Sequence, residues 1–363
     1  MAVLASNFPT LLDLAKISDT DGKVTSVIEI LNESNPVLED MPFKEGNLPT
    51  GERTTLRAML PKPTWRSYNE FVQPTKGQTA QVTFNCGMLE AFGEVDCALA
   101  DLNGNTAAFR ASEDKAHIEG MGQEMATTIF YGDEGDEPAA FTGLGAYYGS
   151  TSGSTGDNVI DGKNCWNGTT AAAAANNLSS VWLVNWGEGI QGIVPKGSMA
   201  GMQSNDLGKT LIQGTSDTST HRDASPGRMM AYVTHYRQDA GLAVRDWRNA
   251  VRIANVSQEI AGDQSAQSTT SGAPGFTTLP ELMFQAYVRL ENGESGRKVW
   301  YMSKPVLMKF AQQLTRMVSQ SSLSTGMVGG KMITSWMGMP IKVVDALSGG
   351  QSTAAGRNEA LVT

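Results

Sequence analysis

The chain has 363 residues, of which 40% are hydrophobic and 18% charged, and its formal net charge is -9. This length and apolar content suffice for roughly two or three domain-sized units with a buried core. The acidic balance disfavours a protein that grips nucleic acid, because phosphate neutralisation needs clustered Lys and Arg. No apolar run approaches the roughly 20 residues that span a bilayer, and the N-terminus lacks the pattern of a secretory signal. We therefore expect a protein made in the cytoplasm and no membrane partner.

Neither the cysteines nor a segment rich in arginine forms a recognisable binding site. Three cysteines contain no CxxC pair, and their odd number argues against a disulfide framework. Six arginines and three aspartates lie between Arg222 and Arg252. We interpret this segment as ion pairs between subunits and capped loops, with an anion-binding site as the alternative.

The sequence of the N-terminal region and of the segment after it predicts elements that are stable only when they pack against another surface. Residues 1–51 contain two short apolar patches separated by a polar stretch, which indicates an arm that packs onto something else. Residues 52–60 and 79–86 alternate apolar and polar side chains, as half-buried strands do. Between these strands lie three prolines and the aromatic residues Trp65, Tyr68 and Phe71.

These two strands predict a long two-stranded projection with an aromatic tip. An isolated ribbon of this kind is marginally stable in water, so it needs a partner surface. Aromatic side chains with an arginine are typical of such contacts. We therefore expect Trp65, Arg66, Tyr68 and Phe71 to contact another subunit, with a hairpin folded back onto its own domain as the alternative.

The middle of the chain contains one clear helix, predicted over residues 113–131. Ser112 is the expected N-cap and Gly132 the expected end. Gly120 and Gly122 each cost about 1 kcal/mol inside a helix, which indicates a bend or a close backbone approach. Residues 133–235 are loop-rich, with short strands expected at 180–186 and 189–195. Residues 247–256 fit either a strand or a short helix.

The last third predicts alternating helices and strands, and hence an α/β unit. Thr278 and Glu281 form a capping box before one helix, and Ser303 is the expected cap of a second. Strands are expected at 298–302 and 338–347. The tail from residue 348 is polar and small.

No pattern of catalytic or metal-binding residues emerges. Three scattered histidines lack metal-site spacing, and no GxSxG nucleophile turn occurs. The stretch DLGKT (206–210) lacks the glycine that a phosphate loop requires at position 203, which is Gln203. We expect no catalytic residue, no cofactor, no metal and no enzyme activity. The alternative from another class is a carbohydrate-binding module or enzyme built on Trp166, Trp182 and Trp186.

The order of these parts, and several stretches of sequence, resemble the major capsid proteins of tailed bacteriophages. The stretches lie at 9–16, 48–66, 87–105, 129–133, 179–201, 245–255 and 337–347. The resemblance implies an α+β protein with the Hong Kong-type capsid fold. It implies an N-terminal arm (1–51), an extended loop (52–86), a peripheral domain (87–239) with a spine helix (113–131) and a loop-rich β insertion, an axial domain (240–347) and a tail (348–363).

The resemblance also implies the function. The chain would be a structural subunit that self-assembles, as hexamers and pentamers, into the icosahedral head shell enclosing the phage genome. It implies a procapsid that matures, a separate scaffolding protein, a portal protein and a decoration protein as a further candidate. Packaged DNA would be contacted only non-specifically, and the shell would be assembled in the bacterial cytoplasm. A tail-tube protein is the alternative among virion components.

Overall fold

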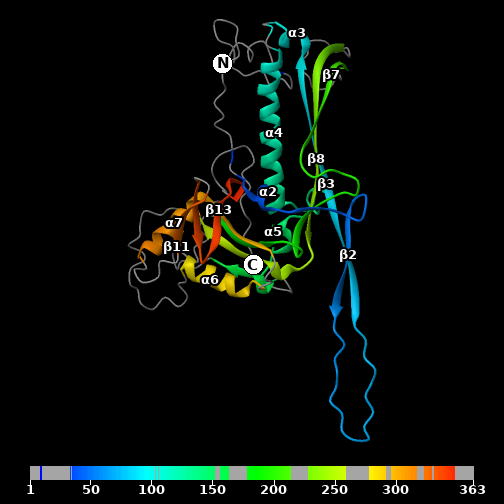
Figure 1. Cartoon of the computed structure of the whole chain (residues 1–363), viewed down its shortest axis with the longest axis vertical. Helices are drawn as coiled ribbons and strands as arrows, with labels where there is room; N and C mark the ends of the chain where they lie inside the picture. The colour runs from blue at the N-terminus through cyan, green and yellow to red at the C-terminus, as the bar shows by residue number, and fades with distance from the viewer. Residues whose placement is uncertain are drawn as a thin grey trace. The chain divides into compact units, whose positions relative to one another are not determined.

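The computed structural model describes most of the chain, and Figure 1 colours it from the N-terminus to the C-terminus. The described residues are 9, 33, 35–102, 104, 106–151, 156–162, 178–213, 228–258, 278–291, 296–316, 323–328 and 331–347. Most of the predicted arm, Cys165, Trp166, Arg222 and the predicted tail lie outside the described residues.

The elements mix helices and strands, as expected of an α+β protein. The helices are α2 (Val37–Asp40), α3 (Cys97–Ala100), α4 (Thr106–Tyr131), α5 (Leu144–Tyr147), α6 (Leu279–Arg289) and α7 (Lys304–Arg316). The strands are β1 (Phe43–Glu45), β2 (Gly51–Met59), β3 (Gln78–Asp96), β4 (Val159–Asp161), β5 (Leu178–Trp186), β6 (Ile190–Val194), β7 (Gln203–Gln213), β8 (Arg228–Val244), β9 (Ala250–Ser257), β10 (Arg297–Met302), β11 (Leu323–Val328), β12 (Lys331–Trp336) and β13 (Met339–Val343). Single 3-10 turns lie at Gly156–Asn158, Trp247–Asn249 and Asp345–Leu347.

The chain divides into two compact units. The first unit comprises Met1–Glu33, Met88–Met125 and Gly201–Asp239, and the second comprises Ser34–Gly87, Ala126–Ala200 and Ala240–Thr363. One sheet has the strand order β1-β6-β8-β3-β2, with β7 also paired to β8. The other sheet lies in the second unit and has the order β11-β12-β13-β10-β5-β9-β4.

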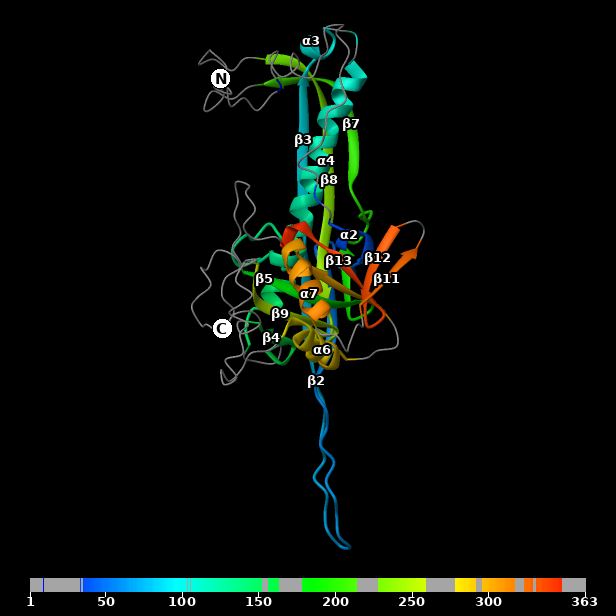
Figure 2. The same ribbon diagram turned by 90° about the vertical axis from the view of Figure 1, so that its left-hand side faces the viewer.

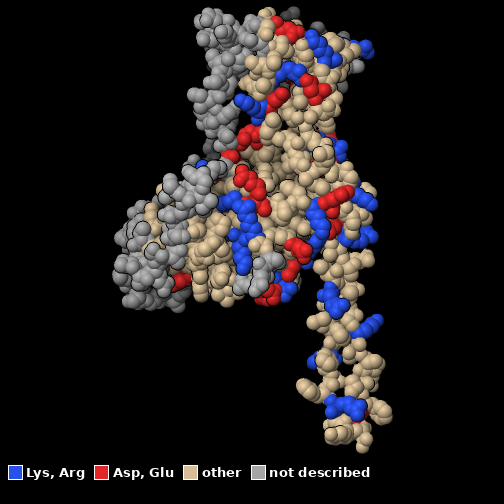
Figure 3. All heavy atoms as spheres, viewed as in Figure 1, with Lys and Arg blue, Asp and Glu red and all other residues tan. Residues whose placement is uncertain are grey.

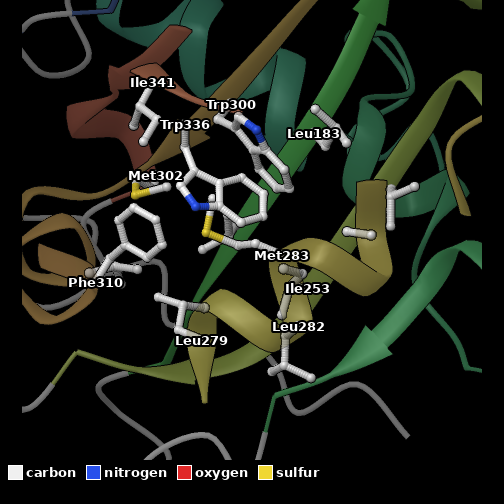
Figure 4. Packing of buried hydrophobic residues seen from close by; sticks show 14 of the residues in the cluster. Leu183, Ile253, Leu279, Leu282, Met283, Trp300, Met302, Phe310, Trp336 and Ile341 are labelled. Carbon is white, nitrogen blue, oxygen red and sulfur yellow. The ribbon is translucent and has the colours of Figure 1, made fainter. Parts of the chain in front are cut away.

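The seven-stranded sheet carries the main core on the face that α6 and α7 cover. Leu183 of β5 and Trp300 and Met302 of β10 pack there with Met283 of α6 and Phe310 of α7 (Figure 4). The Trp336 ring contacts both the Trp300 ring and the Phe310 ring edge-on. The capping box of Thr278 and Glu281 that starts α6 is present as predicted, so the helix begins where its apolar face meets the sheet.

The opposite face of this sheet is also covered. Trp182 and Tyr301, which alternate with Leu183 and Trp300 along their strands, pack against the ring of Phe130 at 6.2 and 6.0 Å between centroids. The Tyr148 ring meets Trp182 edge-on at 5.9 Å. Every residue of β5 is therefore buried, which explains why this strand reads as a continuous apolar run without alternation.

The seven-stranded sheet contains strands from both sides of residue 240, where we predicted a domain boundary. Both β4 and β5 come from the stretch 87–239 that we assigned to a peripheral domain, yet β5 lies between β10 and β9. The boundary in sequence therefore does not separate the strands of this sheet. Residues 247–256, which fitted two interpretations, form a 3-10 turn followed by β9.

Helix α4 begins seven residues before the predicted start, so the assignment of Ser112 as its cap is wrong. The Thr106 hydroxyl donates to the Asp101 carboxylate at 2.8 Å, and Phe109 is buried with Val95 and Ala100, which supports an additional first turn. The predicted end is confirmed, because the Gly132 amide donates to the Thr128 carbonyl and a Cβ there would overlap the Phe141 carbonyl.

The close backbone approach predicted at the glycines inside α4 is not found among the described residues. A Cβ added at Gly120 or Gly122 would meet no other atom within 4 Å. The close approach that these glycines predicted is therefore absent from the described part of the chain.

Strands β7 and β8 were missed in a region predicted to be loop-rich. Their antiparallel pairing in the first unit runs from Gln203 opposite Arg237 to Gln213 opposite Arg228, with an irregularity between Asp206 and Gly208. Gly208 has φ 69°, which suits glycine at a bulge. Because β7 is exposed along most of its length, it lacks the apolar alternation that reveals a strand. The DLGKT stretch lies in this strand and forms no phosphate loop.

The described end of the predicted arm is folded into the second unit. Strand β1 pairs in parallel with β6, and Val37 and Met41 are buried. Residues 35–51, the end of the predicted arm, thus pack within the second unit. None of the described helices is long and apolar enough to cross a membrane.

Asp40 of α2 links residues 35–51 to the seven-stranded sheet through hydrogen bonds and ion pairs. Its side chain is fully buried and accepts hydrogen bonds from the Tyr301 hydroxyl at 2.8 Å and the Lys342 ammonium at 2.7 Å. The Arg297 guanidinium lies 2.9 Å from the same carboxylate. Burial, and next the charge of Asp40, raise the pKa of Tyr301, which keeps its hydroxyl as a donor.

Replacing this carboxylate should destabilise the subunit. We expect Asp40→Ala to lower the free energy of unfolding by about 3 kcal/mol, because it leaves two cations and a buried hydroxyl without their shared acceptor. Chemical denaturation of the unassembled protein measures this. The matched control is Glu39→Ala on the same helix, an exposed position where a change within about 0.5 kcal/mol is expected. Equal losses in the two variants would contradict the anchoring role.

Candidate assembly surface

Strands β2 and β3 form the predicted ribbon, which stands out from the rest of the second unit (Figures 1 and 2). They pair antiparallel from Gly51 opposite Asn85 to Met59 opposite Gln78, with one irregularity between Arg57 and Met59. Threonines recur along both strands, and β-branched side chains favour extended backbone. The strands predicted at 52–60 and 79–86 are therefore confirmed, whereas a hairpin folded back onto its own domain is not observed.

The base of the ribbon is packed into the second unit. Phe84 is buried with Ile193 and Ala243, and the Arg245 guanidinium pairs with the Glu52 carboxylate. Gly51 has φ 155°, and a Cβ there would overlap the Phe84 carbonyl oxygen. Glycine is therefore required where the ribbon leaves the folded part of the unit.

The tip of the ribbon, residues 60–77, closes in a hydrogen-bonded turn. The Glu70 amide donates to the Ser67 carbonyl at 3.3 Å, and the Ser67 amide donates to the Glu70 carboxylate at 2.9 Å. Asn69 has φ 67°, a left-handed conformation that Asn tolerates better than most residues. This turn determines which side chains are presented at the end of the ribbon.

The four residues predicted to contact another subunit all lie at this tip. Trp65, Tyr68 and Phe71 are 103%, 99% and 98% exposed, and Arg66 is exposed as well. Within the described residues, no ring contact joins the three aromatic side chains. Leaving this much aromatic surface in water is unfavourable, and such patches mark binding surfaces.

The ribbon also differs in charge from the protein as a whole. Between residues 51 and 86, five basic residues (Arg53, Arg57, Lys62, Arg66 and Lys76) stand against two acidic ones (Glu52 and Glu70), a net charge of +3 in a chain whose net charge is -9. Figure 3 shows these basic side chains along the projecting part. The tip is therefore both apolar and basic.

The structure does not support the carbohydrate-binding alternative. Trp182 and Trp186 are buried, and the Trp186 indole nitrogen donates to the Tyr301 hydroxyl at 2.8 Å. They belong to the core and cannot form a platform for a sugar ring; Trp166 lies outside the described residues. Among the described residues, no group of three His, Cys, Asp or Glu could hold a metal ion.

Most described arginines of the arginine-rich segment have partners within the chain, and Asp246 caps a turn there as the predicted capped loops require. Pairing between subunits stays a prediction. Arg252 is buried, donates to the Ser180 hydroxyl and the Tyr148 carbonyl, and lies over the Trp182 ring. Other arginines of the segment have carboxylate partners. These pairs are Arg237 with Asp239, Arg245 with Glu52, and Arg248 with Asp246 and Glu291.

A long helix, a projecting ribbon with an exposed tip and a sheet covered on both faces define a structural subunit of the capsid class. The family model described as major capsid protein GP7 matches residues 19–353. The chain therefore belongs to the major capsid protein GP7 family and is a structural subunit of a bacteriophage head shell.

One solved structure supports the fold over the whole chain. The chain matches the structure of bacteriophage Epsilon15 with 29% identity and a TM-score of 0.71, covering 100% of this chain and 99% of that chain. A more distant match is the bacteriophage JBD30 capsid, with 9% identity, a TM-score of 0.42 and coverage of 89% and 96%. No curated protein matches the chain. The fold is the Hong Kong-type capsid fold, as predicted, which favours the shell over the tail-tube alternative.

The tip side chains should contribute little to the stability of a single subunit. We expect Trp65→Ala and Tyr68→Ala to leave the free energy of unfolding within about 0.5 kcal/mol of wild type, because both side chains are already in water. Phe84→Ala at the ribbon base should cost about 3 kcal/mol, since it removes a buried ring. Denaturation of the unassembled subunit distinguishes them. A large loss for Trp65→Ala would place that ring in a core.

Proposed function

We propose that this subunit self-assembles, as hexamers and pentamers, into the icosahedral shell that encloses the phage genome, with its ribbon clasping a neighbouring copy. One observation carries the proposal: Trp65, Tyr68 and Phe71 are wholly exposed at the end of the ribbon, where no described residue covers them. Burial against a second copy would remove this surface from water, at about 25 cal/mol per Å² of apolar area.

The parts of the chain receive their roles from this proposal. Residues 52–86 act as the extended loop that reaches the neighbour, and the helix α4 as the spine of a peripheral domain within 87–239. Residues 240–347, together with β4 and β5, form the axial domain around the symmetry axes. Residues before 35 act as an arm and residues 348–363 as a tail. The likeness to the Epsilon15 structure over the whole chain supports this division.

The proposal includes partners and a place of assembly. The subunit assembles in the bacterial cytoplasm with a separate scaffolding protein and a portal protein, and a decoration protein is a further candidate. It touches packaged DNA only non-specifically, which the net charge of -9 supports because strong DNA binding requires clustered basic residues. It has no enzymatic activity, and its role is mechanical.

Expression of the chain together with the other head genes of its phage tests the proposal. We expect closed particles in negative-stain electron microscopy and a particle mass, by chromatography with light scattering, of many subunits. If only a monodisperse monomer or dimer forms, the proposed shell function is wrong.

Substitutions at the tip test the role of the ribbon. We expect the double variant Trp65→Ala/Tyr68→Ala to reduce the yield of particles by about tenfold or more, because aromatic anchors carry a large share of interface energy. The matched control is Met199→Ala, which removes a 72% exposed apolar side chain elsewhere in the second unit. Particle yield is measured by sedimentation of equal amounts of soluble protein. Normal assembly by the tip variant would contradict the docking role.

A further inference from the structure

One side of helix α4 carries small side chains where a surface helix normally carries long polar ones. A row of residues follows this side at spacings of three and four: Ala108, Ala111, Lys115, Glu119 and Gly122. Both alanines and Lys115 are exposed, as are Ala116 and Gly120 beside the row. Asp114 and His117, which contact Tyr236 of β8, lie on a different side of the helix. We call these five residues the small-residue row.

Packing among the described residues does not explain why glycine occurs at Gly120 and Gly122. A Cβ at either position would meet no other atom within 4 Å, and both residues have ordinary helical backbone. Glycine weakens the interior of a helix relative to alanine, so each position has a cost for α4. A glycine of this kind is typical of a place where another backbone comes close to the helix.

A hydrogen bond from the N-terminal end of the described chain indicates which segment approaches. The Glu33 backbone amide donates to the Glu119 carboxylate at 3.0 Å, although the two residues are 86 positions apart. The Gln123 side-chain amide donates to the same carboxylate at 3.1 Å and so fixes its orientation. Glu119 belongs to the small-residue row and is next to Gly120. The chain that precedes Glu33 is therefore attached to α4 beside the glycines.

The sequence directly before Glu33 has the composition and the reach to cover the row. Residues 26–32, which lie outside the described residues, include four branched apolar side chains: Val27, Ile28, Ile30 and Leu31. Seven extended residues span about 23 Å. Helix α4 rises about 17 Å between Ala108 and Glu119. A segment that starts at Glu119 can therefore follow the row to its beginning, and branched side chains fit over alanines.

We propose that the small-residue row of α4 binds residues 26–32 of the same chain. The apolar side chains of this segment cover the exposed alanines, and Gly120 and Gly122 leave room for its backbone where it meets Glu119. The contact removes apolar surface from water on both partners. It keeps the segment on its own subunit before any neighbour is present, and so it goes beyond the proposed shell function.

Limited proteolysis of the full-length, unassembled subunit tests this contact. Trypsin cleaves after Lys23, next to the bound segment, and after Lys16, which serves as the internal reference. We expect Ala111→Gln/Gly122→Gln to raise the rate of cleavage after Lys23 about tenfold, because cleavage follows the population of the released segment. Glutamine favours helix over glycine, so the variant does not act by weakening α4. Mass spectrometry of the fragments measures both rates.

A second variant changes the segment and leaves α4 intact. Ile28→Ser/Leu31→Ser should raise the same rate about tenfold, and its combination with the helix variant should add little, because both remove one contact. The matched control is Ala58→Gln/Ala139→Gln, which adds side chains of the same size at exposed positions of the second unit. It should be cleaved at the wild-type rate.

Either of two results would overturn the inference. One is cleavage after Lys23 at the wild-type rate in the helix variant or in the segment variant, with circular dichroism verifying that the protein is folded. The other is protection of Lys23 that disappears on dilution, which would place the segment on a second copy. Both measurements use the unassembled subunit, so they are independent of particle formation, whose absence would overturn the proposed function instead.

Discussion

A two-stranded ribbon has two faces and no layer of its own to cover either of them. The β2–β3 ribbon therefore leaves Trp65, Tyr68 and Phe71 in water. These side chains add nothing to the folding stability of a single subunit. Such an element persists only if it is strongly attached at one end and buried elsewhere when the protein assembles. The family to which the chain belongs, whose members build shells, supplies that second condition.

The second unit provides the attachment. Its seven-stranded sheet is covered around β5 and β10 on both faces, by α6 and α7 on one side and by Phe130 and Tyr148 on the other. Phe84 and the Glu52–Arg245 pair anchor the ribbon base in the same unit. The energies of folding and of assembly are thereby separated: the buried residues maintain the subunit, and the tip residues are free to serve the contact.

Exposed ion pairs contribute less free energy to a contact between subunits than apolar burial does. A single exposed ion pair contributes up to about 1 kcal/mol, which is too little to hold a shell together. In the assembly that we propose, the basic residues of the ribbon orient the approach of two copies. In the same proposal, burial of the aromatic tip supplies most of the contact energy. This division is consistent with a protein that is acidic overall yet has a basic ribbon.

Features encoded in local sequence could be predicted from the sequence itself. The alternating strands around Leu56 and Val82, the aromatic tip and the capping box of α6 depend on neighbouring residues only, and all are found where they were expected. The early start of α4 and the exposed strand β7 were missed, because Phe109 is buried by residues outside the helix and β7 is defined by its pairing with β8.

Other features depend on residues far apart in the chain. The arginines from Arg237 to Arg248 looked available to a partner, and only the fold showed their carboxylates within the same subunit. Asp40 gave no sign in sequence of its contacts with Tyr301 and Lys342, some 260 and 300 residues away. The sequence by itself predicted a two-stranded ribbon with aromatic residues at its tip, because both depend on neighbouring residues. Only the tertiary structure decided what anchors that ribbon and which charges lie at its base, because long-range pairing brings those residues together.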